Sequence, residues 1–314
     1  MSGPVSRFMR AGITCSTRSI RMSSAITRRA AGFISACVSA TASLAFAGIA
    51  QAQEAAPENG VASASLCADA YVLALVDDDT ITALSWQVDQ PVSSAPPWSR
   101  SRPKAWPDAA RILALSPAIS VFGSGEGGRT ARLLDRAGYR TFELAWADDF
   151  DGVRDNLRAL AAAVQTDHRV DEVIADLDQR LAALAGRTAA RSRAPRIAYL
   201  SVSGGSAGDG TYVDAAIAAA GGINAVAEQG ATGWTRSDPE FALRLDVDIV
   251  LTSFFIDGYA STFNRASRHR VYRHLLEHPA RADIPAGLWP CAGPRLIDAA
   301  EIIADAIDTW ERSQ

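Results

Sequence analysis

The chain has 314 residues, which is long enough for one large domain or for two lobes that each bury a core. Hydrophobic residues make up 48% of it and charged residues 21%, so a soluble globular protein is the expected class. The formal net charge is −4. A protein that binds nucleic acid needs a basic surface, and the sequence gives no sign of one, so we expect no nucleic-acid partner.

The first 52 residues have the pattern of an export signal. They contain six arginines and no acidic residue, and Arg28 and Arg29 precede an apolar run of small residues at 30–50. Ala50-Gln51-Ala52 then has the small-x-small form of a signal-peptidase site. We predict that residues 1–52 are a signal peptide, which directs export of the protein by the Sec or the twin-arginine route and is then removed. A single membrane anchor and a lipoprotein attached at Cys37 are the alternatives.

Removal of this segment changes the charge and the cysteine content. It leaves 25 basic and 35 acidic residues, a formal charge of −10. Of the four cysteines only Cys67 and Cys291 remain, in a compartment that permits disulfides.

Beyond a polar lead-in, short strand-like runs alternate with helical ones. Strands are predicted at residues 80–85, 119–122 and 140–144, and helices at 129–137 and 150–164. Alternation of this kind indicates a parallel sheet covered by helices.

A long amphipathic segment interrupts the alternation. Apolar residues recur at spacings of three and four from Val170 to Leu184, which predicts one long helix. Strands at 196–202 and 249–253 and a helix at 212–220 follow. The predicted fold class is therefore α/β, with two Rossmann-like lobes joined by one long helix. We place the lobes at 53–165 and 189–314 and the connecting helix at 166–188.

A glycine-rich loop at residues 123–128 follows a predicted strand and opens a predicted helix. Glu143 ends the next strand, at the distance from which an acidic residue binds a ribose hydroxyl in dinucleotide-binding folds. An exported NAD-dependent oxidoreductase of the Rossmann type is thus the enzyme-class alternative. A flexible strand-to-helix loop explains the same glycines.

Five of the seven tryptophans lie at or just beyond predicted strand ends, or on loops beside helix starts. They are Trp86, Trp106, Trp146, Trp234 and Trp289. In open α/β sheets the carboxyl ends of the strands form the ligand-binding edge. The distribution of these rings favours an aromatic ligand site there over ordinary packing.

Together these features resemble the periplasmic substrate-binding proteins of iron-complex and vitamin B12 ABC importers. The resemblance covers nearly all of the chain beyond residue 61, and its short motifs occur in the family's order. They are Ser-Leu-Cys-Ala-Asp-Ala-Tyr at 65–71, Ala-Leu-Ser-Trp at 83–86, Asp-Val-Asp-Ile-Val at 246–250 and Gly-Pro-Arg at 293–295.

The resemblance implies a class III binding protein with a helical backbone, not an enzyme, that works in the periplasm as a monomer. It would capture a bulky metal chelate, cobalamin or another corrinoid, and deliver it to an inner-membrane ABC permease. No resident cofactor or metal is implied. The implied ligand-binding residues are Cys67, Trp86, Trp106, Ser124, Trp234, Trp289 and Cys291.

The resemblance also implies further roles. Glu240 matches a glutamate that docks on the permease, and Asp108 lies two residues from the position of the other docking glutamate, here Ala110. Cys291 stands where the cobalamin binder has a cleft arginine. Cys67 would face it from the first lobe, so we expect the pair to lie close across the cleft, as a disulfide or as two thiols.

Two other ligands fit the same family. Heme or a ferric siderophore is the second candidate, with Tyr259 as the available heme ligand. Zinc or manganese ranks only third as a ligand, because the cleft positions offer too few histidine or carboxylate side chains to bind such an ion. His274 and His278 share a helical spacing, but a solvated helix face explains them more simply.

Overall fold

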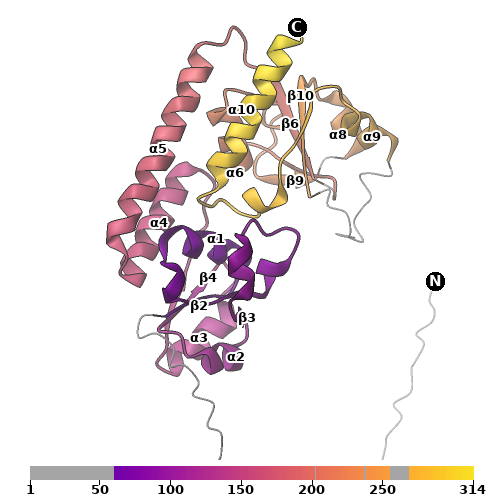
Figure 1. The fold of residues 1–314 in the computed structure, drawn as a ribbon. Coiled ribbons are helices and arrows are strands. Elements are labelled where there is room, and N and C mark those ends of the chain that lie inside the picture. Colours follow the sequence, from indigo (N-terminus) through magenta and orange to yellow (C-terminus); the bar gives the residue numbers. More distant parts are fainter. Residues whose placement is uncertain (1–59, 202, 237, 255–268) are drawn as a thin grey trace, which may run out of the picture. The chain divides into compact units, whose positions relative to one another are not determined.

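The computed structural model describes residues 60–201, 203–236, 238–254 and 269–314. Tyr259 therefore lies outside the described residues. The predicted fold class is confirmed, because two parallel sheets, each with helices packed on it, are connected by one long helix (Figure 1).

The first sheet has the strand order β3-β2-β1-β4-β5, and all its neighbours are parallel. Its strands are β1 (Val61–Ser63), β2 (Ile81–Ser85), β3 (Lys104–Ala105), β4 (Ile119–Phe122) and β5 (Arg140–Glu143). Its helices are α1 (Leu66–Leu75), α2 (Ala109–Leu115), α3 (Gly128–Arg136) and α4 (Phe150–Val164). Short 3-10 turns occur at η1 (Asp78–Thr80), η2 (Trp86–Asp89) and η3 (Pro97–Ser101).

Strand β4 shows how the sequence covers both faces of this sheet. Val121 belongs to the apolar cluster that α1 and α4 share, and the next residue, Phe122, belongs to a second cluster with Ile112 of α2 and Leu134 of α3. Successive strand side chains point to opposite faces, and all four residues of β4 are buried, so helices cover both faces of the sheet at this strand.

The second sheet is built in the same way, with the parallel order β11-β10-β6-β8. Its strands are β6 (Arg196–Ser201), β8 (Ile223–Asn224), β10 (Ile249–Ser253) and β11 (Arg281–Asp283). Strands β7 (Gly205–Ala207) and β9 (Trp234–Arg236) form a separate antiparallel pair. The helices are α6 (Tyr212–Ala219), α7 (Ala225–Glu228), α8 (Pro239–Arg244), α9 (Arg270–Leu276), η5 (Ala286–Leu288) and α10 (Leu296–Arg312).

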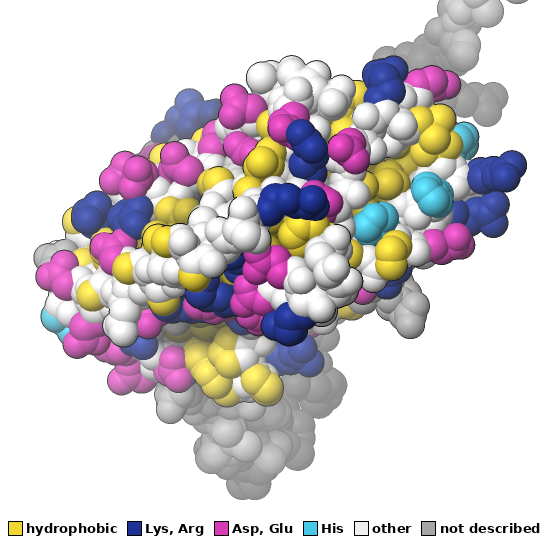
Figure 2. Space-filling model, turned by 90° about the horizontal axis from the view of Figure 1, so that it is seen from above, with side chains coloured by type: hydrophobic (Ala, Val, Ile, Leu, Met, Phe, Trp, Pro, Cys, Tyr) yellow, Lys and Arg dark blue, Asp and Glu magenta, His cyan; other side chains and the backbone are white. Residues whose placement is uncertain are grey.

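Helix α5 (Asp167–Ala189) connects the two sheets. It packs on α1 and α4 of the first lobe and on α6 and α10 of the second. Along α10, Arg180 pairs with Asp298 and Glu301, and seven residues later Arg187 pairs with Asp305 and Asp308. A seven-residue spacing returns to the same helix face after two turns, so both sets of pairs lie along one seam. Basic and acidic side chains are also interspersed over the face seen in Figure 2.

A buried carboxyl group joins α1 to the end of β2. Asp69 is 2% exposed, and it accepts hydrogen bonds from the backbone N–H (2.9 Å) and the hydroxyl (2.5 Å) of Ser85. Burial raises the pKa of Asp69 from 3.8 to about 6, against hydrogen bonds from Ser63 and Ser85 that lower it.

We expect Asp69 to make the folded state less stable as pH rises. The folded protein holds this proton more tightly than the unfolded chain, so stability falls through the window from 3.8 to about 6 and levels off above it. Between pH 5 and pH 7 the loss from this group is roughly 1 kcal/mol. Urea denaturation of the parent and of Asp69→Asn at both pH values measures it. Identical pH dependence in the two proteins would contradict this assignment.

Candidate ligand-binding site

The start of α1 is fixed to the loop after β4. Ser65 caps α1 by accepting a hydrogen bond from the N–H of Ala68 (3.2 Å), and the same hydroxyl accepts one from the N–H of Gly123 (3.0 Å). Ser and Thr are preferred caps because they satisfy a free N–H of the first turn. The cap therefore brings Cys67 and Ser124 together at the carboxyl edge of the first sheet.

A disulfide crosses from the first lobe to the second at this edge. Cys67 on α1 is bonded to Cys291, with Cα atoms 6.0 Å apart, and both residues are half-buried. Beside the bond, the Tyr71 hydroxyl donates to the carbonyl oxygen of Ala292 (2.8 Å). The two cysteines that the resemblance placed opposite each other are thus covalently joined.

The loop that carries Cys291 makes two further contacts with the first lobe. The Ser94 hydroxyl donates to the carbonyl of Gly287 (2.6 Å), and Arg295 donates to the carbonyl of Ser94 (3.2 Å). A Cβ atom at position 287 would lie 2.6 Å from the Ser94 nitrogen, so this close approach requires glycine. The lobes are held together by one covalent and several polar ties.

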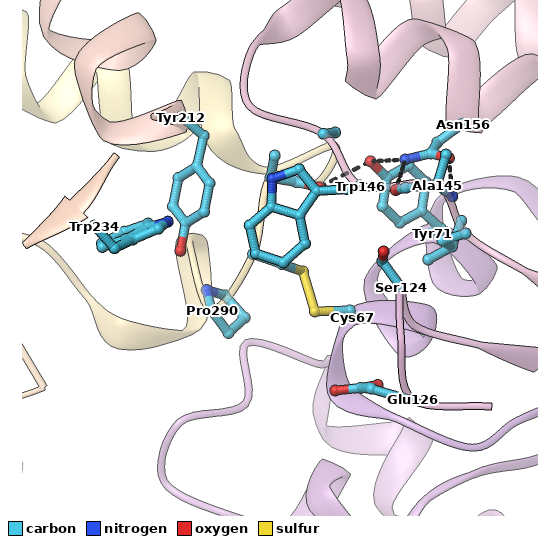
Figure 3. Close-up of a pocket in the computed structure, with 14 residues that line it drawn as sticks. Cys67, Tyr71, Ser124, Glu126, Ala145, Trp146, Asn156, Tyr212, Trp234 and Pro290 are labelled. Atoms are coloured by element: carbon cyan, nitrogen blue, oxygen red, sulfur yellow. Dashed lines mark hydrogen bonds between the residues drawn. A yellow bond between two sulfur atoms is a disulfide. The ribbon is translucent and has the colours of Figure 1, made fainter. Parts of the chain in front are cut away.

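A cavity of about 190 Å³ lies beside the disulfide and is lined by both lobes (Figure 3). Its lining residues are Cys67, Tyr71, Ser124, Glu126, Leu144, Ala145, Trp146, Ala147, Asn156, Tyr212, Trp234, Pro290, Cys291 and Ala292. The first lobe supplies the carboxyl ends of β4 and β5 and the start of α1. The second lobe supplies β9, the start of α6 and the 287–295 loop.

Exposed aromatic rings dominate the walls. Trp146, on the loop after β5, is 63% exposed, and its Nε1 donates to Asp148 (2.8 Å). Trp234, at the start of β9, is 46% exposed and packs on Tyr212 with ring centroids 5.0 Å apart. Figure 3 shows Tyr212 and Trp234 on the second-lobe side of the cavity. The ring of Trp146, which comes from the first lobe, lies between these two residues and Tyr71. Large rings left in water at a cavity are suited to stacking on a flat ligand.

The cysteine and tyrosine side chains on the cavity walls, which are potential metal donors, are already engaged. Both sulfurs are in the disulfide. The Tyr71 hydroxyl donates to Ala292, and the Tyr212 hydroxyl donates to the carbonyl of Trp289 (3.0 Å). Burial raises the pKa of both tyrosines, which disfavours a phenolate. Among the residues described, no three His, Cys, Asp or Glu side chains are grouped to hold a metal ion.

The acidic residue of the dinucleotide-like pattern has a structural partner. Glu143 accepts a hydrogen bond from the N–H of Gly125 (2.8 Å), so its carboxylate is used to fix the glycine loop. The Glu126 carboxylate lies over the same loop, close to Gly123. A second negative charge at this loop disfavours an anionic pyrophosphate, so the geometry does not support NAD binding.

Trp86 and Trp106 lie at the predicted sheet edge but outside this cavity. They follow β2 and β3 directly and stack on each other, with centroids 5.0 Å apart and planes 4° from parallel. The guanidinium of Arg111 lies 5.0 Å from the Trp106 ring centre. These two rings therefore contact each other and an arginine, and the structure does not place them with the cavity residues.

The prediction for Trp289 is wrong. Its side chain is 1% exposed, its Nε1 donates to the Ser253 hydroxyl (3.1 Å), and its ring packs on Tyr199. The loop before the last helix does reach the cavity, but through Pro290 and Cys291. Trp289 points into the core of the second lobe because a large ring gains more by full burial there.

The two predicted docking residues lie on helix starts. Asp108 is exposed and caps α2 by accepting from the N–H of Arg111 (2.9 Å). Glu240 is exposed in the first turn of α8, which Asp238 caps. Neither residue lines the cavity.

Several lining residues were not assigned from the sequence. They are Tyr71, Glu126, Trp146, Asn156, Tyr212 and Pro290. Trp146 had a signal, its place just beyond a strand end. Tyr71 lay within a motif of the resemblance, and Glu126 within the glycine loop. Asn156 lies inside α4, and nothing in the sequence marks which helical asparagine turns toward a site.

Comparison with known proteins defines the family. The chain belongs to the periplasmic binding protein family, whose model matches residues 76–287, more than half of its length. The family is one of solute-binding proteins of ABC importers, not one of enzymes. A search of curated proteins finds no match.

Solved structures share the fold at low sequence identity. The apo heme-binding protein RhuT of Roseiflexus sp. RS-1 matches with a TM-score of 0.64 and 21% identity, over 79% of this chain and 98% of its own. A periplasmic heme-binding protein of Pseudomonas aeruginosa matches with 0.64 and 22%, over 79% and 92%. The vitamin B12-binding protein BtuF of Vibrio cholerae matches with 0.59 and 18%, over 81% and 98%. In the described part of this chain, no helix is long and apolar enough to span a membrane.

Proposed function

We propose that this protein captures a bulky corrinoid, with cobalamin as the type ligand, and delivers it to an inner-membrane ABC permease. The observation that carries the proposal is the chemistry of the cavity wall. Exposed aromatic rings line it, while its cysteines and tyrosines are bonded to partners within the protein. Such a wall suits a ligand whose metal is already coordinated and which binds through its faces and edges.

The size of the cavity supports partial enclosure. A volume of about 190 Å³ is below the range of roughly 300–1,000 Å³ that encloses a drug-sized ligand. A corrinoid therefore enters with one edge, and the exposed faces of Trp146 and Trp234 contact the rest. The stacked Trp86 and Trp106, at the same sheet edge, extend the aromatic surface in this proposal.

Heme is the second candidate, because solved neighbours of this fold include heme-binding proteins. Heme iron in proteins is held by His, Cys, Met or Tyr. All three methionines lie within residues 1–52, and no histidine is among the cavity residues. The described part of the cavity wall thus offers heme iron no free ligand of these types, and Tyr259, outside the described residues, is the candidate that the sequence supplies.

The absorption spectrum of the protein purified from its native host tests the proposal. Corrinoid bands in the visible range, released with the ligand on denaturation, are the expected result. A Soret band of bound heme, or the charge-transfer band of a ferric siderophore, would instead establish the second candidate.

We further propose the cellular setting that the sequence predicted. Residues 1–52 act as a cleaved signal peptide, and the mature protein works in the periplasm as a monomer. Its two lobes are residues 53–165 and 189–314, and the helix at 166–188 connects them. Glu240 and Asp108 face the permease. The exposed position of both carboxylates, away from the cavity, supports this role.

Glu240→Gln should leave the ligand Kd unchanged and lower uptake through the permease severalfold. A docking carboxylate acts on the complex and not on the cavity, whereas a dipole role in α8 would change stability by only a few tenths of a kcal/mol. Uptake of labelled ligand by cells carrying the variant measures the effect. Glu172→Gln, an exposed change on α5, is the control. Normal uptake by Glu240→Gln cells would remove the docking role.

A further inference from the structure

Two oxygen-bearing side chains of the cavity wall have no hydrogen-bond partner among the described residues. Tyr71, Tyr212 and Asn156 are bonded, the last through its amide to both backbone groups of Ala145 (2.8 and 2.9 Å). The Ser124 hydroxyl and the Glu126 carboxylate remain for a ligand. Figure 3 shows both on the first-lobe side, across the cavity from Tyr212 and Trp234.

The loop that carries these two groups is fixed. Its backbone is held at Gly123 by Ser65 (3.0 Å), at Gly125 by Glu143 (2.8 Å) and by the bond from the Glu126 N–H to the Gly123 carbonyl (3.1 Å). These ties fix the backbone from which the Glu126 side chain extends, so its charge stays at the first-lobe edge of the cavity and contributes to selection.

Among the described residues of the cavity wall, no positive side chain offsets this charge. None of the lining residues that the structure describes is Arg, Lys or His. Asp148, which holds Trp146, adds a second negative charge nearby, and its field acts with burial to raise the pKa of Tyr212. The cavity is thus complementary to groups that donate N–H bonds or carry positive charge, and it repels carboxylates.

We infer that Glu126 selects for corrinoids whose peripheral side chains are amides and against those whose side chains are carboxylates. The inference rests on the proposed function and names the chemical group by which the site discriminates. A primary amide donates N–H to the Glu126 carboxylate and to the Ser124 oxygen. A carboxylate at the same place can donate nothing and meets a like charge at close range.

A matched pair of ligands tests this inference. Dicyanocobinamide carries amide side chains, and cobyrinic acid carries the corresponding carboxylates on the same corrin ring. Isothermal titration of the purified protein at pH 7.5 and low salt should give an affinity at least about tenfold higher for the amide form. Added salt should reduce this difference in affinity, because it screens the repulsion between the ligand carboxylates and Glu126.

Glu126→Gln should reduce the ratio of the two affinities to about threefold or less, mainly because cobyrinic acid binds more tightly to the variant. Glutamine keeps an oxygen that accepts from an amide, so cobinamide affinity should change less than about threefold. Glu172→Gln should leave both values unchanged, and thermal denaturation checks that the variants are folded.

The outcomes separate the two claims. If the parent binds neither corrinoid, the proposed function fails. If the parent binds both equally, or Glu126→Gln leaves the ratio of the two affinities as it was or weakens both ligands alike, the corrinoid site stands and the role of Glu126 is overturned.

Discussion

Replacing Cys67 and Cys291 together by alanine is expected to lower the free energy of unfolding by about 2 to 5 kcal/mol. The disulfide closes a loop with a sequence separation of 224 residues. For a loop of that length the chain-entropy relation gives about 5 kcal/mol, and native disulfides usually contribute 2 to 4. Urea denaturation of the variant and of the oxidised parent, followed by tryptophan fluorescence, measures the difference.

Reduction of the parent protein is the control for this expectation. A reducing agent should shift the parent transition to that of the double variant and leave the variant itself unchanged. Both forms should still fold, because the Tyr71–Ala292 and Ser94–Gly287 hydrogen bonds remain. Equal free energies of unfolding for the reduced and the oxidised parent would show that the disulfide does not stabilise the protein.

Trp234→Ala should weaken ligand binding by about 50-fold, and Trp146→Ala by a similar or larger factor. Roughly half of each indole is exposed at the cavity, 46% for Trp234 and 63% for Trp146. Covering about 100 Å² of ring surface stabilises a complex by about 2.5 kcal/mol. Fluorescence or calorimetric titration of each variant with cobalamin gives the Kd values.

Trp98→Ala is the matched control, because Trp98 is 37% exposed but lies outside the cavity. Its affinity should equal that of the parent. Trp86→Ala and Trp106→Ala then report whether the ligand reaches the stacked pair at the end of β2 and β3. Parent-like binding by both Trp146→Ala and Trp234→Ala would rule out the aromatic cavity as the site.

Buried strands and long amphipathic helices could be predicted from the sequence because their periodicity is strong. The bounds at 119–122, 150–164 and 249–253 agree with β4, α4 and β10. Helix α1 was missed because it is apolar around most of its surface and so has no polar face. Strands of two or three residues, such as β3 and β8, are too short to show alternation.

The site was less predictable, because a position on a loop does not fix the direction of a side chain. Trp289 and Cys291 are two residues apart on one loop, yet the ring is buried in the second lobe and the sulfur reaches the first. Placement at strand ends directed attention to Trp146 and Trp234, and both line the cavity. Tyr212 and Asn156 join them only through packing between the lobes, which no local pattern encodes.

Equilibrium titration of the purified protein with cyanocobalamin, with hemin as the comparison ligand, tests the central claim most directly. We expect saturable 1:1 binding of cobalamin with a Kd below about 1 μM, quenching of tryptophan fluorescence beyond the inner-filter effect, and at least tenfold weaker binding of hemin. Tight hemin binding with the spectrum of a protein–iron bond, and no binding of cobalamin, would contradict the assignment of the cavity to a corrinoid.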